Sequence, residues 1–250
     1  LLGVAQTGTG KTAAFALPIL QLLQRAPEPT APAVLVLAPT RELALQVAAS
    51  FRTLGAGGPW PLRALAVIGG ASLDDQIAAL DQGVHVVVAT PGRLLDLMRR
   101  DAVDLSQVRH LVLDEADKLL DADFIEEVPG LLEVLSVERQ TLLFSATLPQ
   151  RVLAVGARLM RAPQTVRIDD APTPVATIEQ RAYTVDAEKR RALLQHLLRA
   201  ESWGQTLIFV ATRRAAENLA NKLRLAGFFT AALHGDLDQR SRDEALLQLL

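Results

Sequence analysis

Short apolar runs alternate with amphipathic stretches along the first two thirds of the chain. The runs hold hydrophobic residues at successive positions rather than at every second position, as in AVLVLAP at 33–39 and VHVVVAT at 84–90. Strands of this kind are buried on both faces, which is typical of a parallel sheet with helices on each side. The pattern predicts strands within residues 1–5, 33–39, 62–70, 84–90, 110–113, 141–147 and 164–169.

A change in composition near residue 170 predicts two domains. The segment DAPTPVAT at 170–177 contains two prolines among small residues, which favours a linker. We expect a first domain at 1–170, a linker at 171–178 and a partial second domain at 179–250. In the second domain the pattern predicts strands within 178–186, 206–211 and 230–235, and helices around 188–201, 213–227 and 238–250.

A glycine-rich sequence, AQTGTGKT, follows the first predicted strand and opens the first predicted helix. Glycines let backbone N–H groups approach phosphates, the lysine reaches the terminal phosphates, and the threonine hydroxyl suits Mg²⁺. Glycine-rich turns also precede helices for packing reasons, so the motif by itself is only moderately specific. It predicts a nucleotide-binding loop formed by Ala5, Gln6, Thr7, Gly8, Thr9, Gly10, Lys11 and Thr12.

An acidic pair, Asp114 and Glu115, closes the apolar run HLVL at 110–113. An aspartate in this position suits the Mg²⁺ shell, and a glutamate can orient and deprotonate an attacking water. Because the carboxyl ends of parallel strands meet at one edge of a sheet, we expect this pair beside the glycine-rich loop. We therefore predict nucleoside triphosphate hydrolysis, with Lys11, Asp114 and Glu115 as catalytic residues. Thr12 and Asp114 are the predicted Mg²⁺ ligands.

Charge and composition narrow the possibilities. The 28 acidic residues slightly outnumber the 26 basic ones, so any nucleic-acid contact must be local rather than a broad basic surface. The absence of cysteine excludes disulfides and thiolate metal sites, and the four histidines have no ligand-like spacing. No apolar run approaches the roughly 18 residues of a membrane span, and the first residues lack a signal-peptide pattern. We expect a cytoplasmic location.

Short motifs follow one another along the whole chain: AQTGTGKT at 5–12, PTRELALQV at 39–47, GG at 69–70, TPGR at 90–93, VLDEAD at 112–117, SATLP at 145–149, TLIFVATRR at 206–214 and LHGDLDQRSR at 233–242. This series resembles the DEAD-box ATP-dependent RNA helicases of superfamily 2. The resemblance implies an α/β fold with a RecA-like parallel sheet and helices on both faces, followed by a partial second RecA-like lobe. It implies ATP and Mg²⁺ as cofactors and RNA as a partner, bound through its backbone with little sequence dependence.

The same resemblance implies roles for individual residues. Asp117, Ser145 and Thr147 would couple the acidic motif to closure of the two lobes around RNA. The family's adenine-recognition segment and finger arginines are missing from this sequence, so we expect a fragment with weak or no turnover. The implied RNA contacts are Pro39, Thr40, Arg41, Gly69, Gly70, Thr90, Pro91, Gly92, Arg93, Arg213, Gly235, Gln239 and Arg242.

Structural explanations compete with several of these assignments. Ser145 or Thr147 could cap a helix, Arg41 could be an exposed residue of a first helical turn, and TPGR could form a turn. Two adjacent aspartates at 74–75 resemble a metal pair, but Ser72 followed three residues later by Asp75 predicts a capping box instead.

Two other functions remain open. The chain could bind nucleotide or RNA without turnover, which a measurement of ATP hydrolysis would decide. It could also be a DNA-directed superfamily 2 translocase, which stimulation by RNA or by DNA would decide. PTREL, TPGR and DEAD occurring together disfavour the translocase.

Overall fold

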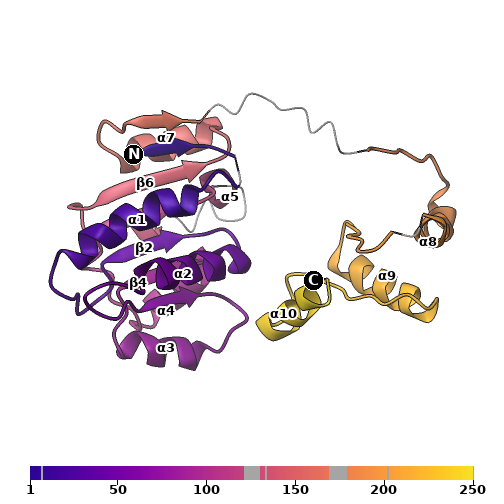
Figure 1. Cartoon of the computed structure of the whole chain (residues 1–250), viewed down its shortest axis with the longest axis horizontal. Helices are drawn as coiled ribbons and strands as arrows, with labels where there is room; N and C mark the ends of the chain where they lie inside the picture. The colour runs from indigo at the N-terminus through magenta and orange to yellow at the C-terminus, as the bar shows by residue number, and fades with distance from the viewer. Residues whose placement is uncertain (7, 121–129, 133, 169–178, 202, 250) are drawn as a thin grey trace. The chain divides into compact units, whose positions relative to one another are not determined.

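The structure is a computed structural model that describes residues 1–6, 8–120, 130–132, 134–168, 179–201 and 203–249 (Figure 1). Its contacts divide the chain into two units, Leu1–Pro172 and Thr173–Leu250, which we describe separately. The linker predicted at 171–178 lies outside the described residues.

The first unit contains a seven-stranded, all-parallel sheet with the strand order β3-β4-β2-β5-β6-β1-β7. The predicted α/β class with a parallel sheet is confirmed. The first strand of the chain lies between the last two, so its pairing joins residues far apart in the sequence. The strands are β1 (Leu2–Val4), β2 (Val34–Leu37), β3 (Ala64–Val67), β4 (Val86–Ala89), β5 (His110–Leu113), β6 (Gln140–Ser145) and β7 (Thr165–Arg167).

Helices cover both faces of the sheet because its central strands are apolar at every position. In β2, Val34 and Val36 pack into a core with α1 and α2, whereas Leu35 and Leu37 pack into a second core with α4, α5 and α7. All four side chains are fully buried. The helices of this unit are α1 (Lys11–Gln24), α2 (Arg41–Gly55), α3 (Leu73–Asp81), α4 (Pro91–Arg99), α5 (Ala116–Leu119) and α7 (Gln150–Leu159).

The strand order decides which loops become neighbours. β5, β6 and β1 are adjacent in the sheet, so the segments that follow them share one stretch of its carboxyl edge. These segments carry the DEAD, SAT and glycine-rich motifs. The segments after β3, β4 and β2 carry GG, TPGR and PTREL and continue the same edge. Open α/β sheets bind ligands along this edge.

The described residues of the second unit, 179–201 and 203–249, form helices without a strand. Across the described parts of both units, no helix combines the length and the apolar character needed to cross a membrane. The helices of the second unit are η1 (Ala187–Lys189), α8 (Arg190–Ala200), α9 (Arg213–Leu225) and α10 (Gln239–Leu247).

The strands predicted within 178–186, 206–211 and 230–235 are therefore wrong for the described residues. Leu207 is 67% exposed and Phe209 is 91% exposed, although the apolar run around them predicts burial. A strand forms only where its N–H and C=O groups pair with a neighbouring strand. The described part of this unit gives these segments no such partner.

Candidate nucleotide and nucleic-acid site

The glycine-rich loop joins the end of β1 to the start of α1. Gly8 and Gly10 have φ angles of 86° and 87°, in the left-handed region that favours glycine. A Cβ at either position would meet nothing within 4 Å, so the backbone angle rather than space requires glycine. Gly10 precedes a helix of 14 residues, whose N-terminal N–H groups favour an anion. Thr7, also predicted to bind nucleotide, lies outside the described residues.

Two side chains of the loop fold back over its own backbone. Lys11 Nζ donates to the Ala5 carbonyl at 2.8 Å, and Thr9 Oγ1 donates to the Gln6 carbonyl at 2.8 Å. A phosphate oxygen is a charged acceptor and is therefore a stronger partner for the ammonium than this carbonyl. Thr12, a predicted Mg²⁺ ligand, is half-buried in the first turn of α1. Binding of an anion would therefore draw Lys11 away from the Ala5 carbonyl.

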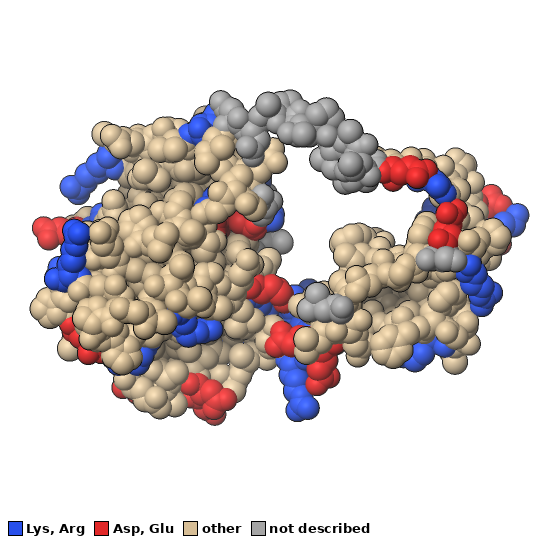
Figure 2. Space-filling model, viewed as in Figure 1, with Lys and Arg blue, Asp and Glu red and all other residues tan. Residues whose placement is uncertain are grey.

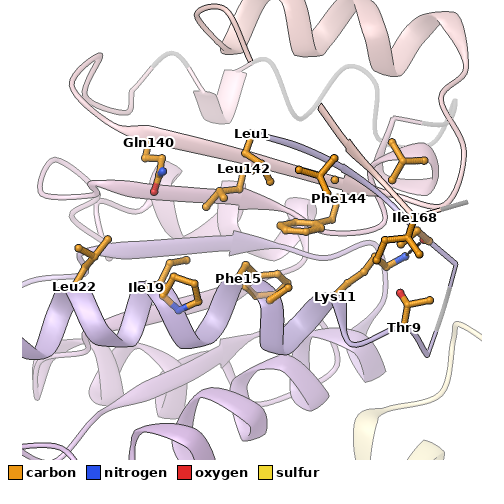
Figure 3. A pocket seen from close by; sticks show the side chains of 16 residues that line it. Leu1, Thr9, Lys11, Phe15, Ile19, Leu22, Gln140, Leu142, Phe144 and Ile168 are labelled. Atoms are coloured by element: carbon orange, nitrogen blue, oxygen red, sulfur yellow. Dashed lines mark hydrogen bonds between the residues drawn. The ribbon is translucent and has the colours of Figure 1, made fainter. Parts of the chain in front are cut away.

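An apolar pocket of about 380 Å³ opens beside this loop (Figure 3). Phe15 of α1 lines one wall, while Phe144 of β6 and Ile168 line the other. Lys11 and Thr9 lie at one end of the same pocket. The arrangement suits a ligand with an apolar ring and an anionic tail that reaches the loop.

The acidic motif begins directly after β5, which is separated only by β6 from β1, the strand that leads into the glycine-rich loop. Asp114 is 2% exposed, and this burial raises its pKa to about 6. The Glu115 N–H, which donates to Asp114 Oδ1 at 3.0 Å, and the charge of Lys11 act in the opposite direction without cancelling the effect of burial. A buried carboxylate of this kind favours a cation beside it.

Glu115 has a strained backbone and a paired side chain. Its φ of 49° and ψ of 51° are left-handed, which costs a residue with a Cβ about 1 kcal/mol. Lys118 Nζ donates to Glu115 Oε2 at 2.8 Å, so the carboxylate is held by a lysine three residues further along the chain. The acidic motif thus combines a left-handed backbone at Glu115 with an ion pair to Lys118.

Asp117, Ser145 and Thr147 form one hydrogen-bonded network between the acidic motif and the end of β6. Thr147 donates to Asp117 Oδ2 through its N–H at 3.2 Å and its hydroxyl at 2.7 Å. Ser145 Oγ accepts the Asp117 N–H at 3.2 Å and donates to the Thr147 carbonyl at 2.6 Å. Burial alone would raise the pKa of Asp117, but these hydrogen bonds outweigh it and lower that pKa. Helix α7 has no side-chain cap, so the capping role weighed for Ser145 and Thr147 is wrong.

Two helices begin at predicted RNA-binding motifs of the first unit. Thr40 caps α2, because its hydroxyl accepts the backbone N–H three residues further on at 3.2 Å. Thr90 precedes α4 without capping it, and Pro91 occupies the first turn of that helix. Pro39 and Pro91 are buried, whereas Thr40 and Gly92 are exposed. Exposed helix starts present backbone N–H groups of the kind that bind phosphates.

Two arginines contact the loop after β3 that carries Gly69 and Gly70, the GG loop (residues 68–72). The guanidinium of Arg41 lies 3.5 Å from the place that a Cβ on Gly69 would occupy. Arg93 Nη1 donates to the Ala71 carbonyl at 3.2 Å, and Gly70 between them has a φ of 79°. Burial, more than any neighbouring charge, lowers the pKa of Arg93. On the visible face of the first unit, basic and acidic side chains are interspersed (Figure 2). The charge of Asp96 acts on the pKa of Arg93 in the opposite direction to that of Arg41.

The candidates of the second unit also come together, within their own unit. Arg213, the first residue of α9, forms an ion pair with Asp236 and lies 3.8 Å from the place of a Cβ on Gly235. Arg242 Nη1 donates to a backbone carbonyl, that of His234, at 2.9 Å. Gln239, the first residue of α10, is largely buried and its amide donates to Asp243 Oδ1 at 2.8 Å. The two arginines are thus held near the turn that precedes α10.

Comparison with models of known protein families identifies the family that shares these motifs. Residues 1–155 match the family model described as DEAD/DEAH box helicase, which covers more than half of the chain. The chain belongs to the DEAD/DEAH box helicase family. Residues 188–249 of this DEAD/DEAH box chain match a second model, the helicase conserved C-terminal domain.

Curated relatives and a solved structure agree with this assignment. The ATP-dependent RNA helicase DeaD of Escherichia coli (strain K12) is 44% identical over 249 residues, which are 100% of this chain and 39% of the relative. The DEAD-box ATP-dependent RNA helicase CshA of Streptococcus pneumoniae is 40% identical over 97% of this chain and 45% of its own length. A DEAD box protein from the hyperthermophile Methanococcus jannaschii has 35% identity and a TM-score of 0.62, covering 99% of this chain and 65% of that one. The DEAD/DEAH box chain thus spans about two fifths of the length of the DeaD relative.

Some features of this DEAD/DEAH box chain were not predicted from sequence. Lys118 holds Glu115, and Gln76 binds the backbone of the GG loop, although neither residue belongs to a recognised motif. A signal for Gln76 was present, since it is a polar residue on the apolar stripe of α3. The Asp75 N–H donates to Ser72 Oγ at 3.2 Å, which is one of the two hydrogen bonds of the predicted capping box.

Proposed function

We propose that this chain carries the ATP- and RNA-binding machinery of an ATP-dependent RNA helicase that couples ATP hydrolysis to local unwinding of RNA duplexes. The observation that carries the proposal is the network of Asp117, Ser145 and Thr147. A site that only stores a nucleotide has no need of a link between its acidic motif and the neighbouring loop. A machine that must couple hydrolysis to a movement does need one. The names of the curated relatives support the same function.

Thr12 and Asp114 fit a magnesium ion that arrives with the nucleotide. Mg²⁺ prefers oxygen ligands, and it is usually bound through one or two protein ligands together with phosphate oxygens. Asp114 is a buried carboxylate with a pKa of about 6, so a cation beside it would favour its ionised form. When bound, the ion would neutralise charge that develops on the phosphates.

The remaining groups act on the nucleotide and on water. Lys11 would exchange the Ala5 carbonyl for a phosphate oxygen, and the N–H groups around Gly8 and Gly10 would bind the other phosphates. Glu115 would orient the attacking water and accept its proton on a carboxylate oxygen as the bond to the terminal phosphorus forms and the bridging P–O bond breaks.

RNA would bind to the first unit through Arg41, Arg93 and the helix starts at Thr40 and Thr90. Arginine forks and backbone N–H groups recognise phosphates rather than bases, so the binding would depend little on sequence. The proposed nucleotide site lies along the same edge of the sheet, so both ligands would bind to one row of loops.

Nucleotide binding tests the first half of the proposal. Lys11→Ala is expected to weaken binding of a fluorescent ATP analogue with Mg²⁺ by about 10- to 100-fold, the loss that follows from removing a charge-assisted hydrogen bond. Lys189→Ala is the matched control, because Lys189 is an exposed lysine of the second unit paired with Asp186. Equal affinity in the two variants would refute the assigned site.

Hydrolysis with and without single-stranded RNA tests the second half. Weak RNA-stimulated turnover that Glu115→Gln abolishes is the expected result. Nucleotide and RNA binding without any turnover would instead favour the non-catalytic module. Stimulation by a DNA oligonucleotide of the same length, and not by RNA, would favour the DNA-directed translocase.

A further inference from the structure

A buried glutamine on α3 holds the loop that carries the two glycines. Gln76 is only 5% exposed, and its amide makes three hydrogen bonds to the backbone of this loop. Gln76 Oε1 accepts the Ile68 N–H at 3.0 Å. Gln76 Nε2 donates to the Ile68 carbonyl at 3.2 Å and to the Ser72 carbonyl at 3.0 Å.

The amide takes the place of a neighbouring strand. β3 ends at Val67, and the next residue, Ile68, pairs both its N–H and its C=O with one side-chain amide, as it would with a peptide group. Both N–H donors and the oxygen of the amide are used. Because each group left unpaired in this buried position would cost free energy, the loop has one favoured conformation.

The same loop also contacts the two arginines proposed to bind RNA. Arg41 lies against Gly69, and Arg93 donates to the Ala71 carbonyl. The loop from 68 to 72 is therefore bonded by Gln76 at Ile68 and Ser72 and contacted by guanidinium groups at Gly69 and Ala71. A change in its path would move the surface on which the arginines rest.

We propose that Gln76 is a positioning residue for RNA binding, which fixes the GG loop and thereby the placement of Arg41 and Arg93. The inference rests on the proposed RNA-binding function, because it concerns the phosphate contacts of that site. It assigns Gln76 no contact with RNA itself, and it predicts that nucleotide binding at the distant end of the same edge is independent of this residue.

Gln76→Met tests this, because methionine keeps the volume of the side chain but cannot bond the loop. We expect binding of a short fluorescein-labelled oligouridylate to weaken about tenfold, as for the loss of one hydrogen bond to a charged group. The salt dependence of binding should flatten by about 0.7 in slope for each RNA phosphate that the variant no longer neutralises. Affinity for the fluorescent ATP analogue should stay unchanged. Gln82→Met is the matched control, because Gln82 is an exposed glutamine that follows α3.

A double-mutant cycle separates positioning from general support of the fold. If Gln76 acts through the arginines, Gln76→Met and Arg93→Ala together should weaken RNA binding by less than the product of their separate effects. Amide hydrogen exchange at Ile68 supplies a readout that needs no RNA, and its protection should fall in Gln76→Met.

The outcomes are distinguishable. Unchanged RNA affinity in a folded Gln76→Met chain with faster exchange at Ile68 would overturn the inference. A parallel loss of RNA and nucleotide affinity would overturn it as well, because it would show general structural damage. If Gln76→Met does not fold, Gln76→Glu keeps the acceptor for Ile68 but removes both donors, and it must show the same separation of RNA from nucleotide binding. Failure of the unmodified chain to bind RNA would refute the proposed function itself, and this inference with it.

Discussion

Replacing Asp114 with asparagine is expected to stabilise the nucleotide-free first unit while removing a predicted Mg²⁺ ligand. Burial raises the pKa of this carboxyl from 3.8 to about 6. Between these pH values the folded chain keeps a proton that the unfolded chain has lost, so stability falls as the pH rises through this range. At about 1.4 kcal/mol per pKa unit, the full cost of the ionised form above pH 6 is about 3 kcal/mol. Asparagine avoids this cost and can still accept the Glu115 N–H.

Denaturant unfolding followed by tryptophan fluorescence measures the effect. The chain has two tryptophans, so a Trp203→Phe background leaves Trp60 as the reporter of the first unit. In this background, Asp114→Asn should raise the free energy of unfolding by about 1–3 kcal/mol at neutral pH, and by about half as much near pH 5. Asp117→Asn is the matched control with the opposite sign, because hydrogen bonds lower the pKa of Asp117 and their weakening should cost about 1 kcal/mol.

Two results would refute this reasoning. A loss of stability on Asp114→Asn at neutral pH would mean that the ionised carboxylate is not a net cost in the folded chain. A gain that stays constant down to pH 5 would mean that the effect is not electrostatic. Addition of ATP and Mg²⁺ should reverse the ranking, because ligand that binds only the folded unmodified chain stabilises it by mass action.

Two further predictions concern packing and pH. Gly3→Ala should lower the free energy of unfolding by about 1–3 kcal/mol, because the new Cβ would lie 2.6 Å from ring atoms of Phe144; Gly57→Ala, with nothing within 4 Å, should change it little. Burial, and then the charge of Arg63, lower the pKa of His85 from 6.5, so the unfolded chain is protonated first as the pH falls. His85 should therefore contribute a loss of stability below about pH 6.5, opposite in sign to the contribution of Asp114, and His85→Gln should remove this contribution when unfolding is compared at neutral and acidic pH. Equal pH dependence in both chains would contradict the assignment to His85.

The strands of the first unit were predictable because burial on both faces leaves a direct mark on the sequence. The predicted run at 33–39 is longer than β2, which spans Val34–Leu37. Its flanking residues, from Ala33 to Pro39, are buried as well, and an apolar pattern reports burial rather than hydrogen bonding. For the same reason the pattern predicted strands around Phe209, where the apolar residues have no neighbouring strand among the described residues.

The site was predictable where function depends on residue type and unpredictable where it depends on contacts. Gly8, Lys11 and Asp114 could be named as candidates from the sequence because phosphate and Mg²⁺ chemistry needs those groups at that spacing. The pairing of Lys118 with Glu115 and the hydrogen bonds of Gln76 depend on local backbone geometry. A periodic pattern shows which side of a helix is buried, but it does not show which carbonyl a buried amide will meet.

The position of β1 between β6 and β7 determines when, during synthesis of the chain, the proposed nucleotide site can form. Leu2 pairs with Leu143 of β6 on one side and with Thr165 of β7 on the other. A chain made at about 5–20 residues per second completes these partners on the order of ten seconds after β1 itself has been made. Until then the backbone N–H and C=O groups on both edges of β1 have no partner strand, and the glycine-rich loop is not anchored to a sheet. A chaperone bound to the ribosome would therefore meet an apolar strand before its partner strands have been made.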